Sequence, residues 1–417
     1  DLTLRYNGSS VFGSNNRWGT FWSFGLGWNL HKEKFIENLG FVNLLKLRAS
    51  YGLTGNQNFN PYQAKSTYSY YSDVVYDNIT GAYLMAMANE NLKWQQTGDL
   101  NAGLDMQLFH VLNVRLDVYK SKTKDALLAM TLPTSTGFNS YQENLGNVEN
   151  LGFDATVNWK LYSKGTDFFS LNASIGHNKN KVVKISDALK AYNDKVESDA
   201  MGDDPNKKTN LPIIRYEEGQ SMTAIWAVKS LGIDPATGKE LFLKRDGVTT
   251  TYNYDTNDKI VAGDSNPKYH GNFGFNGEYK GIGLSCSFSY RFGGDYYNQT
   301  LVSRVENVDI ANNVDKRVLH DTWNNIGDIA TYKKIQVTPI TTYPTTRFIE
   351  RNNELQLASL SCYYDFKYQP WLKKIKVERL KLSFYANDLF RVSTVKTERG
   401  LNYPYARNFS FSLSATF

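Results

Sequence analysis

Side chains that could bind a metal ion or act as a nucleophile are few in this sequence and lie far apart along it. The histidines are His31, His110, His177, His270 and His320, and the cysteines are Cys286 and Cys362. No two of them have the spacing of a metal-binding motif, and no G-x-S-x-G, P-loop or G-x-G-x-x-G sequence is found. We therefore predict no catalytic residue, no metal site and no cofactor. Nothing in the sequence supports a disulfide between the two cysteines.

Two pairs of adjacent carboxylates, Asp203–Asp204 and Glu217–Glu218, are the remaining candidates for acid–base chemistry. A glycosidase needs two carboxyl groups ~5–10 Å apart across a cleft. Neighbouring residues in a polar loop rarely provide that geometry, so we interpret both pairs as solvated charge.

Polar residues also recur at every second position within apolar segments. Leu112, Val114, Leu116 and Val118 alternate with Asn113, Arg115, Asp117 and Tyr119. The same period occurs in segments 45–51, 104–108, 153–161, 272–279, 284–291 and 380–386. Alternation with period two places the two kinds of side chain on opposite faces of a strand. The sequence therefore predicts an all-β, antiparallel protein, with only region 222–270 ambiguous.

Strand length and loop length favour a membrane β-barrel over a soluble sandwich. Many alternating runs reach about ten residues, against a mode of ~5–6 in soluble sheets, and ten residues at a ~40° tilt cover a ~25 Å apolar band. Short connections are expected at 109–111, 163–166, 280–281 and 369–375, and long ones at 54–97, 121–150, 180–221, 293–352 and 391–406. Short turns on one side and long loops on the other are typical of outer-membrane barrels. Tyrosines near several strand ends, such as Tyr51 and Tyr290, fit interfacial girdles.

The C-terminus continues the alternation to its last residue. The apolar positions are Phe409, Phe411, Leu413, Ala415 and Phe417, and serine or threonine stands between them. We interpret this segment as the closing strand of an outer-membrane barrel, with the terminal aromatic residue as an insertion signal. A last strand of a soluble sandwich is the alternative.

In a barrel, the polar strand faces line the lumen, and seven of their residues are candidates for a substrate path. These candidates are Arg48, Asp105, Gln107, Arg115, Asp117, Asn158 and Lys160. Their mixed charges suit a hydrated path for a neutral or zwitterionic substrate. The same residues could equally hydrogen-bond a plug inside the barrel, and the sequence does not separate the two roles.

Composition excludes several other classes of protein. The 417 residues include 47 Lys+Arg and 41 Asp+Glu, a formal charge of +6, which is too small and too evenly spread for a dedicated nucleic-acid binder. Two cysteines exclude a disulfide scaffold. No apolar run approaches the ~18–20 residues of a membrane-spanning helix. The chain begins at Asp1 without a signal peptide, so we expect either that one was removed or that the chain is the interior of a longer precursor.

Several short motifs, in order along nearly the whole chain, resemble one family. They are Arg5–Gly13 with the Phe21–Trp28 strand, Asn89–Trp94, Thr134–Phe138 with Asn144–Phe153, Gly263–Tyr269, Arg347–Glu350 and Ala386–Phe390. Each motif alone is weak, but their order and spacing are specific. Together they resemble the C-terminal part of a SusC/RagA-type TonB-dependent outer-membrane transporter of Bacteroidetes.

The resemblance implies a 22-stranded barrel with an N-terminal plug, energised by TonB and covered by a SusD-like surface lipoprotein. It implies import of oligosaccharides or peptides across the outer membrane of a Gram-negative bacterium, with outer-membrane lipids around the barrel and no nucleic-acid partner. Residues 1–417 are then expected to form one partial barrel without the plug and the first strands. The family often has a calcium-like Asp-rich turn; here Asp255–Ile260 lacks its glycine and places Lys259 at a ligand position, so we interpret it as a polar turn.

Two other functions remain compatible with the sequence. The chain could be a SusC-like barrel kept as a structural or docking subunit of a larger outer-membrane complex. It could also be a soluble all-β protein that binds or hydrolyses carbohydrate. The sequence does not identify a cargo.

Overall fold

The computed structural model describes residues 1–56, 64–86, 88–131, 140–187, 189–191, 193–194, 197, 211–308, 314–335, 342–396 and 407–417. β-Strands dominate the described part of the chain, where most helices have only one or two turns. Within the described ranges, no helix has the length and apolar character needed to cross a membrane.

Strands make up most of the ordered elements, and short helices lie between some of them. The strands are β1 (Leu2–Gly8), β2 (Trp18–Asn29), β3 (Val42–Asn56), β4 (Thr67–Tyr76), β5 (Ile79–Ala86), β6 (Gln95–Leu108), β7 (Leu112–Thr131), β8 (Ser140–Lys164), β9 (Asp167–Ile185), β10 (Ala224–Ile233), β11 (Glu240–Leu243), β12 (Thr250–Thr251), β13 (Lys259–Asp264), β14 (Tyr269–Tyr279), β15 (Ile282–Tyr297), β16 (Ile349–Asp365), β17 (Arg379–Asn387), β18 (Arg391–Ser393) and β19 (Asn408–Thr416). The short helices are η1 (Leu30–Lys32), α1 (Lys34–Glu37), η3 (Thr256–Asp258), α3 (Gln299–Leu301), the π-helical η4 (Val302–Glu306), η5 (Lys316–Leu319), η6 (Thr346–Phe348), η7 (Phe366–Tyr368) and η8 (Pro370–Ile375).

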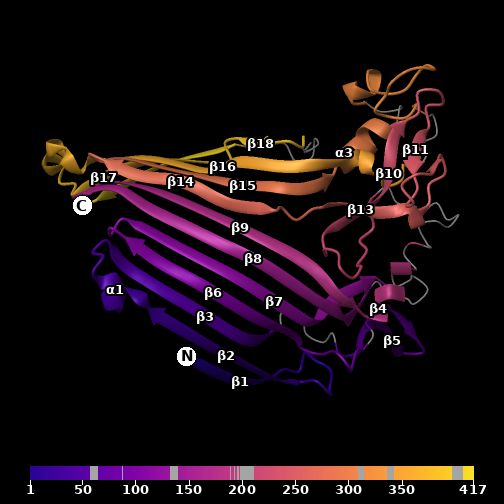
Figure 1. Ribbon diagram of the computed structural model, residues 1–417, viewed down its shortest axis with the longest axis horizontal. Coiled ribbons are helices and arrows are strands. Elements are labelled where there is room, and N and C mark those ends of the chain that lie inside the picture. The colour runs from indigo at the N-terminus through magenta and orange to yellow at the C-terminus, as the bar shows by residue number, and fades with distance from the viewer. Residues whose placement is uncertain are drawn as a thin grey trace.

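One long antiparallel sheet forms the body of the molecule. Its strand order is β1-β2-β3-β6-β7-β8-β9-β14-β15-β16-β17-β19, with β18 added beside β16. Figure 1 shows this sheet as a curved wall, with β4, β5, β10, β11 and β13 gathered at one end of it. We call that end the loop end. The opposite end, which we call the short-turn end, carries the tight connections of β6 to β7, β8 to β9 and β14 to β15. The β16–β17 connection there is longer than the expected 369–375 turn, because η7 and η8 lie within it.

The register of the sheet confirms that polar and apolar side chains lie on opposite faces. Leu47 of β3 is opposite Leu104 of β6, which is opposite Leu116 of β7. One residue further along each strand, Arg48 is opposite Gly103, which is opposite Asp117. The apolar face remains exposed to a degree unusual for a soluble sheet, since more than half of the surface of Leu100 and Val118 is accessible.

The strands extend further toward the loop end than the alternation in the sequence predicts. Region 121–150 is predicted there as a loop, but β7 continues to Thr131 and β8 begins at Ser140. At the start of this part of β7 both faces are polar, because Lys122 and Lys124 point to one side and Ser121 and Thr123 to the other. Residues 126–130 are then all apolar. The alternation that identifies a strand in the sequence is therefore lost, although the backbone pairing continues.

The ambiguous region 222–270 forms a separate small sheet at the loop end, with strand order β12-β11-β10-β13. Together with α3, η4, η5 and η6 it makes what we call the loop assembly. Its interior is a cluster of buried apolar residues that includes Val302, Val305 and Phe348, each with 1% or less of its surface exposed. Thus the expected long loop 293–352 is in part a packed structure with its own core.

Candidate functional site

The polar face of the long sheet carries a four-membered ion network near its middle. The Arg48 guanidinium donates two hydrogen bonds to the Asp105 carboxylate, at 2.7 and 3.0 Å, and one of 2.9 Å to Asp117. Arg115 donates a 2.8 Å hydrogen bond to the other oxygen of Asp117 and lies 4.0 Å from Asp105. The side chain of Arg115 is 63% exposed, against 14% for Asp117. Arg115 is therefore the member of the network that is open to a molecule on this face.

The network depends on a glycine in the strand between its partners. Gly103 of β6 lies between Arg48 of β3 and Asp117 of β7 in the sheet register. A Cβ atom at position 103 would be 2.6 Å from both the Arg48 Nη2 and the Asp117 Oδ1 atoms. The absence of a side chain at Gly103 thus lets the guanidinium reach across one strand to its second carboxylate.

The other candidate residues of the substrate path lie on the same face, nearer the short-turn end. Gln107 donates a 3.0 Å hydrogen bond to Asn113. Asn158 lies opposite Asn113 in the register, and Lys160 lies opposite Ser170; both side chains are exposed. The structure therefore joins Arg48, Asp105, Arg115 and Asp117 into one network but leaves Gln107, Asn158 and Lys160 outside it.

A second ion cluster, which the sequence does not predict, is buried in the loop assembly. The Arg347 guanidinium lies between the carboxylates of Glu240 and Glu306, and donates to Glu240 at 3.0 and 3.2 Å. It also hydrogen-bonds to Glu306 through both terminal nitrogens. The side chains of Arg347, Glu240 and Glu306 are 8%, 2% and 1% exposed. Lys333 adds a second positive charge, 3.4 Å from Glu240 and 3.5 Å from Glu306, so the cluster is neutral.

The charges of this cluster stabilise one another against burial. Burial acts to raise the pKa of Glu240, but the charge and hydrogen bonds of Arg347 outweigh it and hold that pKa below its usual value. Burial likewise acts to lower the pKa of Arg347, and the hydrogen bonds to Glu306 with the charge of Glu240 raise it instead. Thr345 donates to Glu240 at 2.9 Å and Thr342 to Glu306 at 3.0 Å, which satisfies further oxygens. The cluster therefore fixes η4, β11 and η6 together.

The only sequence signal for this cluster is the Arg347–Glu350 motif, which carries no chemistry by itself. Glu240 and Glu306 lie 107 and 41 residues before Arg347 along the chain. Because no local spacing connects them, sequence patterns alone do not bring the three together.

A polar cavity of about 360 Å³ lies where β13 gives way to β14, beside the loop ends of β9 and β15. Amides and carboxylates line it, among them Asn178, Asn266 and Asp295. Most of these groups already have partners: Asn266 donates to the backbone of Asn178 at 3.1 Å, and Asp295 pairs with Arg351 at 3.2 Å. The Oδ1 atom of Asn178 is buried without a hydrogen bond from the described residues. This cavity could accept a hydroxyl-rich or amide-rich group.

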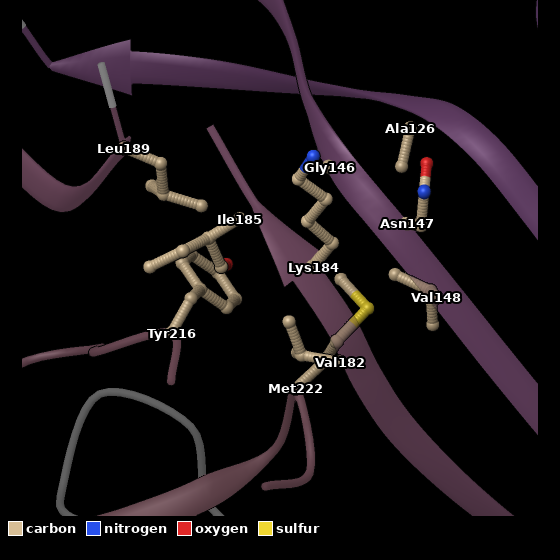
Figure 2. Close-up of a pocket in the computed structure, with 10 residues that line it drawn as sticks. All are labelled: Ala126, Gly146, Asn147, Val148, Val182, Lys184, Ile185, Leu189, Tyr216 and Met222. Carbon is tan, nitrogen blue, oxygen red and sulfur yellow. The ribbon is translucent and has the colours of Figure 1, made fainter. Parts of the chain in front are cut away.

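A second pocket, shown in Figure 2, lies between the loop ends of β7, β8 and β9 and the segment around Tyr216 and Met222. Val148 and Val182 lie there beside Met222, and Leu189 lies near Ile185 (Figure 2). The pocket has room for only about 10 Å³, which is about one water molecule. It is therefore a packing contact between the long sheet and the next segment of the chain, not a ligand site.

Two of the sequence motifs have structural roles at the loop end. Asn144 accepts a 2.9 Å hydrogen bond from the Lys93 backbone and donates to the carbonyl groups of Lys93 and Asp125, at 3.2 and 2.8 Å. Nearby, Gly13 donates to the Leu92 carbonyl at 3.1 Å. These contacts tie segment 89–94 to both β7–β8 and the β1–β2 connection.

The predicted polar turn Asp255–Ile260 has no cation-binding geometry. The Asp255 side chain accepts from the backbone of Asn257, and Lys259 is buried 3.6 Å from Glu197. In the part of the chain that the structure describes, no group of three His, Cys, Asp or Glu side chains is arranged to hold a metal ion. Cys286 and Cys362 are both free thiols.

The C-terminal residues form β19, which pairs with β17 along its whole length. Phe409, Phe411, Leu413 and Ala415 all lie on one face, where the ring of Phe384 of β17 stacks on Phe409 and makes a tilted contact with Phe411. Phe411 is 75% and Phe417 83% exposed. The apolar face of the sheet thus continues to its edge.

Comparison with known proteins shows what the chain is similar to. Residues 1–212 match the family model described as "TonB dependent receptor-like, beta-barrel". The chain is 26% identical to the TonB-dependent receptor P39 of Formosa agariphila, covering 93% of this chain and 40% of that protein. It is 31% identical to the TonB-dependent receptor SusC of Bacteroides thetaiotaomicron, covering 62% of this chain and 26% of that protein. The chain thus spans less than half the length of these relatives.

A solved structure shares the fold. The structure described as the RagAB peptide transporter matches 95% of this chain and 42% of its own, with a TM-score of 0.79 and 23% sequence identity. At that identity the likeness concerns the fold alone. It confirms the predicted all-β, antiparallel barrel architecture, of which this chain is a part.

Proposed function

Because the chain belongs to the TonB-dependent receptor β-barrel family, we propose that it forms the wall of a SusC-like importer in the outer membrane of a Gram-negative bacterium. The imported substrates are oligosaccharides or peptides too large for passive pores. The family membership, the relative named SusC and the fold of the RagAB peptide transporter support this proposal. Residues 1–417 act as one part of the barrel.

The observation that carries the proposal is the division of the long sheet into an apolar and a polar face. In a membrane the apolar side chains contact acyl chains, and the polar face, with Arg48 and Arg115, encloses water. Among the described residues, β1 pairs only with β2 and β19 only with β17, so each has one unpaired edge. An unpaired edge in hydrocarbon leaves backbone groups unsatisfied at several kcal/mol each. We therefore expect both edges to pair with further strands of the complete barrel.

The partners follow from the same proposal. A SusD-like lipoprotein would meet the barrel at the loop end, on the outer surface of the cell, where the loop assembly and the polar cavity lie. TonB would act through a segment outside residues 1–417. The polar face would serve as a path for cargo, and Arg115, Asn158 and Lys160 are its exposed candidates.

Growth of a strain that lacks the gene tests this function. Cells are given single oligosaccharides or peptides as sole carbon or nitrogen source, and uptake of the labelled nutrient is measured. We expect loss of uptake of one substrate class, with restoration by the wild-type gene. Unchanged uptake of every nutrient would favour a scaffold role instead. Heat-modifiable migration of the purified protein on a gel is expected for a barrel, and its absence would favour a soluble protein.

A further inference from the structure

Five lysines gather on the apolar face of the long sheet, just beyond the last apolar rows toward the loop end. We call them the outer lysine cluster; they are Lys120, Lys122 and Lys124 of β7 and Lys179 and Lys181 of β9. In the register, Lys120 and Lys179 flank Leu151 of β8, and Lys122 and Lys181 flank Glu149. Adjacent strands are ~4.8 Å apart and alternate residues ~6.6 Å, so the five ammonium groups share a patch about 10 Å wide.

The patch has a large excess of positive charge. Glu149 is the carboxylate within it, 3.0 Å from Lys120 and 3.6 Å from Lys122. Within the described residues, no ion pair involves Lys124, Lys179 or Lys181. Lys122 is 62% exposed, and Lys124, Lys179 and Lys181 are also exposed. Among the described side chains, Glu149 is thus shared between two lysines of the cluster, and the other three have no carboxylate.

The position of the cluster along the strands matches the boundary between the hydrocarbon core and the headgroups of a membrane. Lys122 lies ten residues along β7 from Leu112 at the short-turn end, which at ~3.3 Å per residue and a ~40° tilt is ~25 Å. The row just below the cluster contains Phe153, His177 and Tyr269, and the His177 ring contacts the rings on both sides of it. Aromatic residues of this kind mark the boundary between hydrocarbon and headgroups. The lysines therefore lie at headgroup level, above a face that acyl chains would cover.

We propose that the outer lysine cluster binds the phosphate groups of an outer-leaflet glycolipid of the lipid A type. A phosphorylated glycolipid complements both parts of this surface. Its phosphates can pair with the ammonium groups, and its acyl chains can pack on Val118, Leu116 and Ile175. A free phosphate ion would use only the first of these. The proposal rests on the membrane placement in the proposed function but not on transport.

The test uses the full-length protein purified in detergent, with native mass spectrometry to count bound lipid. The probes are bisphosphorylated lipid A, the same lipid without its phosphates, and inorganic phosphate. We expect lipid A to remain bound to the wild type when the dephosphorylated lipid or inorganic phosphate is added as a competitor. The variant K120Q/K122Q/K179Q/K181Q is expected to bind lipid A at least roughly tenfold more weakly. Equal binding of the dephosphorylated lipid, or displacement by inorganic phosphate, would overturn the proposal.

Matched variants separate the site from charge in general. The variant K164Q/K280Q/K374Q/K376Q removes the same charge from exposed lysines at the short-turn end and should bind lipid A like the wild type. Glu149→Gln frees Lys120 and Lys122 from their carboxylate and should strengthen binding. If the quadruple variant does not insert, K179Q/K181Q replaces it, since these two lysines have no ion pair within the described residues to lose. If an inserted variant that lacks these lysines binds lipid A as the wild type does, the proposed lipid site is refuted, and the transport function is not affected by that result. If the wild type binds lipid A but imports no nutrient, only the transport function is refuted.

Discussion

The guanidinium group of Arg48 passes directly over Gly103 to reach Asp117, two strands away. The Arg48 Nη2 atom would be only 2.6 Å from a Cβ at position 103. A glycine in the middle of a strand weakens the strand itself, by roughly 0.5–1 kcal/mol relative to alanine. Here that weakness is offset by an ion network that crosses β3, β6 and β7.

Gly103→Ala should break this network, although replacing glycine by alanine within a strand normally stabilises the strand. The new methyl group must displace the Arg48 side chain, so the Arg48–Asp117 contact is lost. Because Arg48 is about one quarter exposed, we expect a loss of only about 1 kcal/mol, measured as a lower melting temperature in detergent. Gly25→Ala on β2, where a Cβ meets no atom within 4 Å, is the control and should leave the melting temperature unchanged or higher. Equal effects at both positions would contradict the bridging role of Gly103.

Arg347→Ala should be among the most damaging substitutions in the loop assembly. It leaves Glu240 and Glu306 buried with Lys333 as their only remaining cation among the described residues. Removing one partner of a buried ion pair costs about 3–5 kcal/mol. We expect a large loss of thermal stability and faster proteolysis within residues 211–348. Arg351→Ala, which removes an arginine that is 51% exposed, should cost less than about 1 kcal/mol.

The loop assembly should lose stability in acid because of Glu240. The pKa of Glu240 is lower in the folded protein than the usual 4.5. As the pH is lowered, the unfolded chain therefore binds a proton at this residue before the folded protein does. The stabilisation is complete above pH 4.5 and is lost as the pH falls from there through the lowered pKa. Melting curves of the wild type between neutral pH and about pH 3 should show this decline. Glu240→Gln should be less stable at neutral pH and decline less, while Glu37→Gln in the exposed helix α1 should follow the wild type.

Gly13→Ala should disturb the β1–β2 connection through its backbone contact with segment 89–94. A Cβ at position 13 would lie 1.8 Å from the Glu90 carbonyl oxygen, and a backbone atom cannot rotate away as a side chain does. Phe12 and Trp94, whose rings stack at 4.2 Å, would have to separate. We expect a loss of about 2–4 kcal/mol, measured by denaturant unfolding. A variant as stable as the wild type would show that the segment shifts freely.

Phe417→Asp, or deletion of Phe417, should reduce the amount of protein in the outer membrane. The reason is the proposed role of the terminal aromatic residue as the signal that the insertion machinery reads. Phe417→Tyr keeps the aromatic ring and should insert normally. Immunoblots of fractionated membranes measure the outcome, and wild-type membrane levels of the aspartate variant would refute the role.

The sequence by itself determined the fold class and the two faces of the long sheet. Residues such as Val114 and Arg115 alternate because one face meets an apolar environment and the other a polar one, so each position records its own surroundings. The same local pattern correctly predicted the tight turns at 109–111 and 280–281. It failed in 121–131, because residues 121–125 are polar and residues 126–130 are apolar without alternation, although the strand continues.

Only the tertiary structure decided which charged residues meet. The alternation predicts that Arg48, Asp105 and Asp117 share a face, but their contact depends on the register of three strands and on the missing side chain of Gly103. The burial of Arg347 between Glu240 and Glu306, and the gathering of Lys120 with Lys179 around Leu151, leave no local pattern. The physical reason is that alternation depends only on the solvent on each side of one strand. Pairing between distant segments depends on register and packing, and the sequence of a single strand does not determine these.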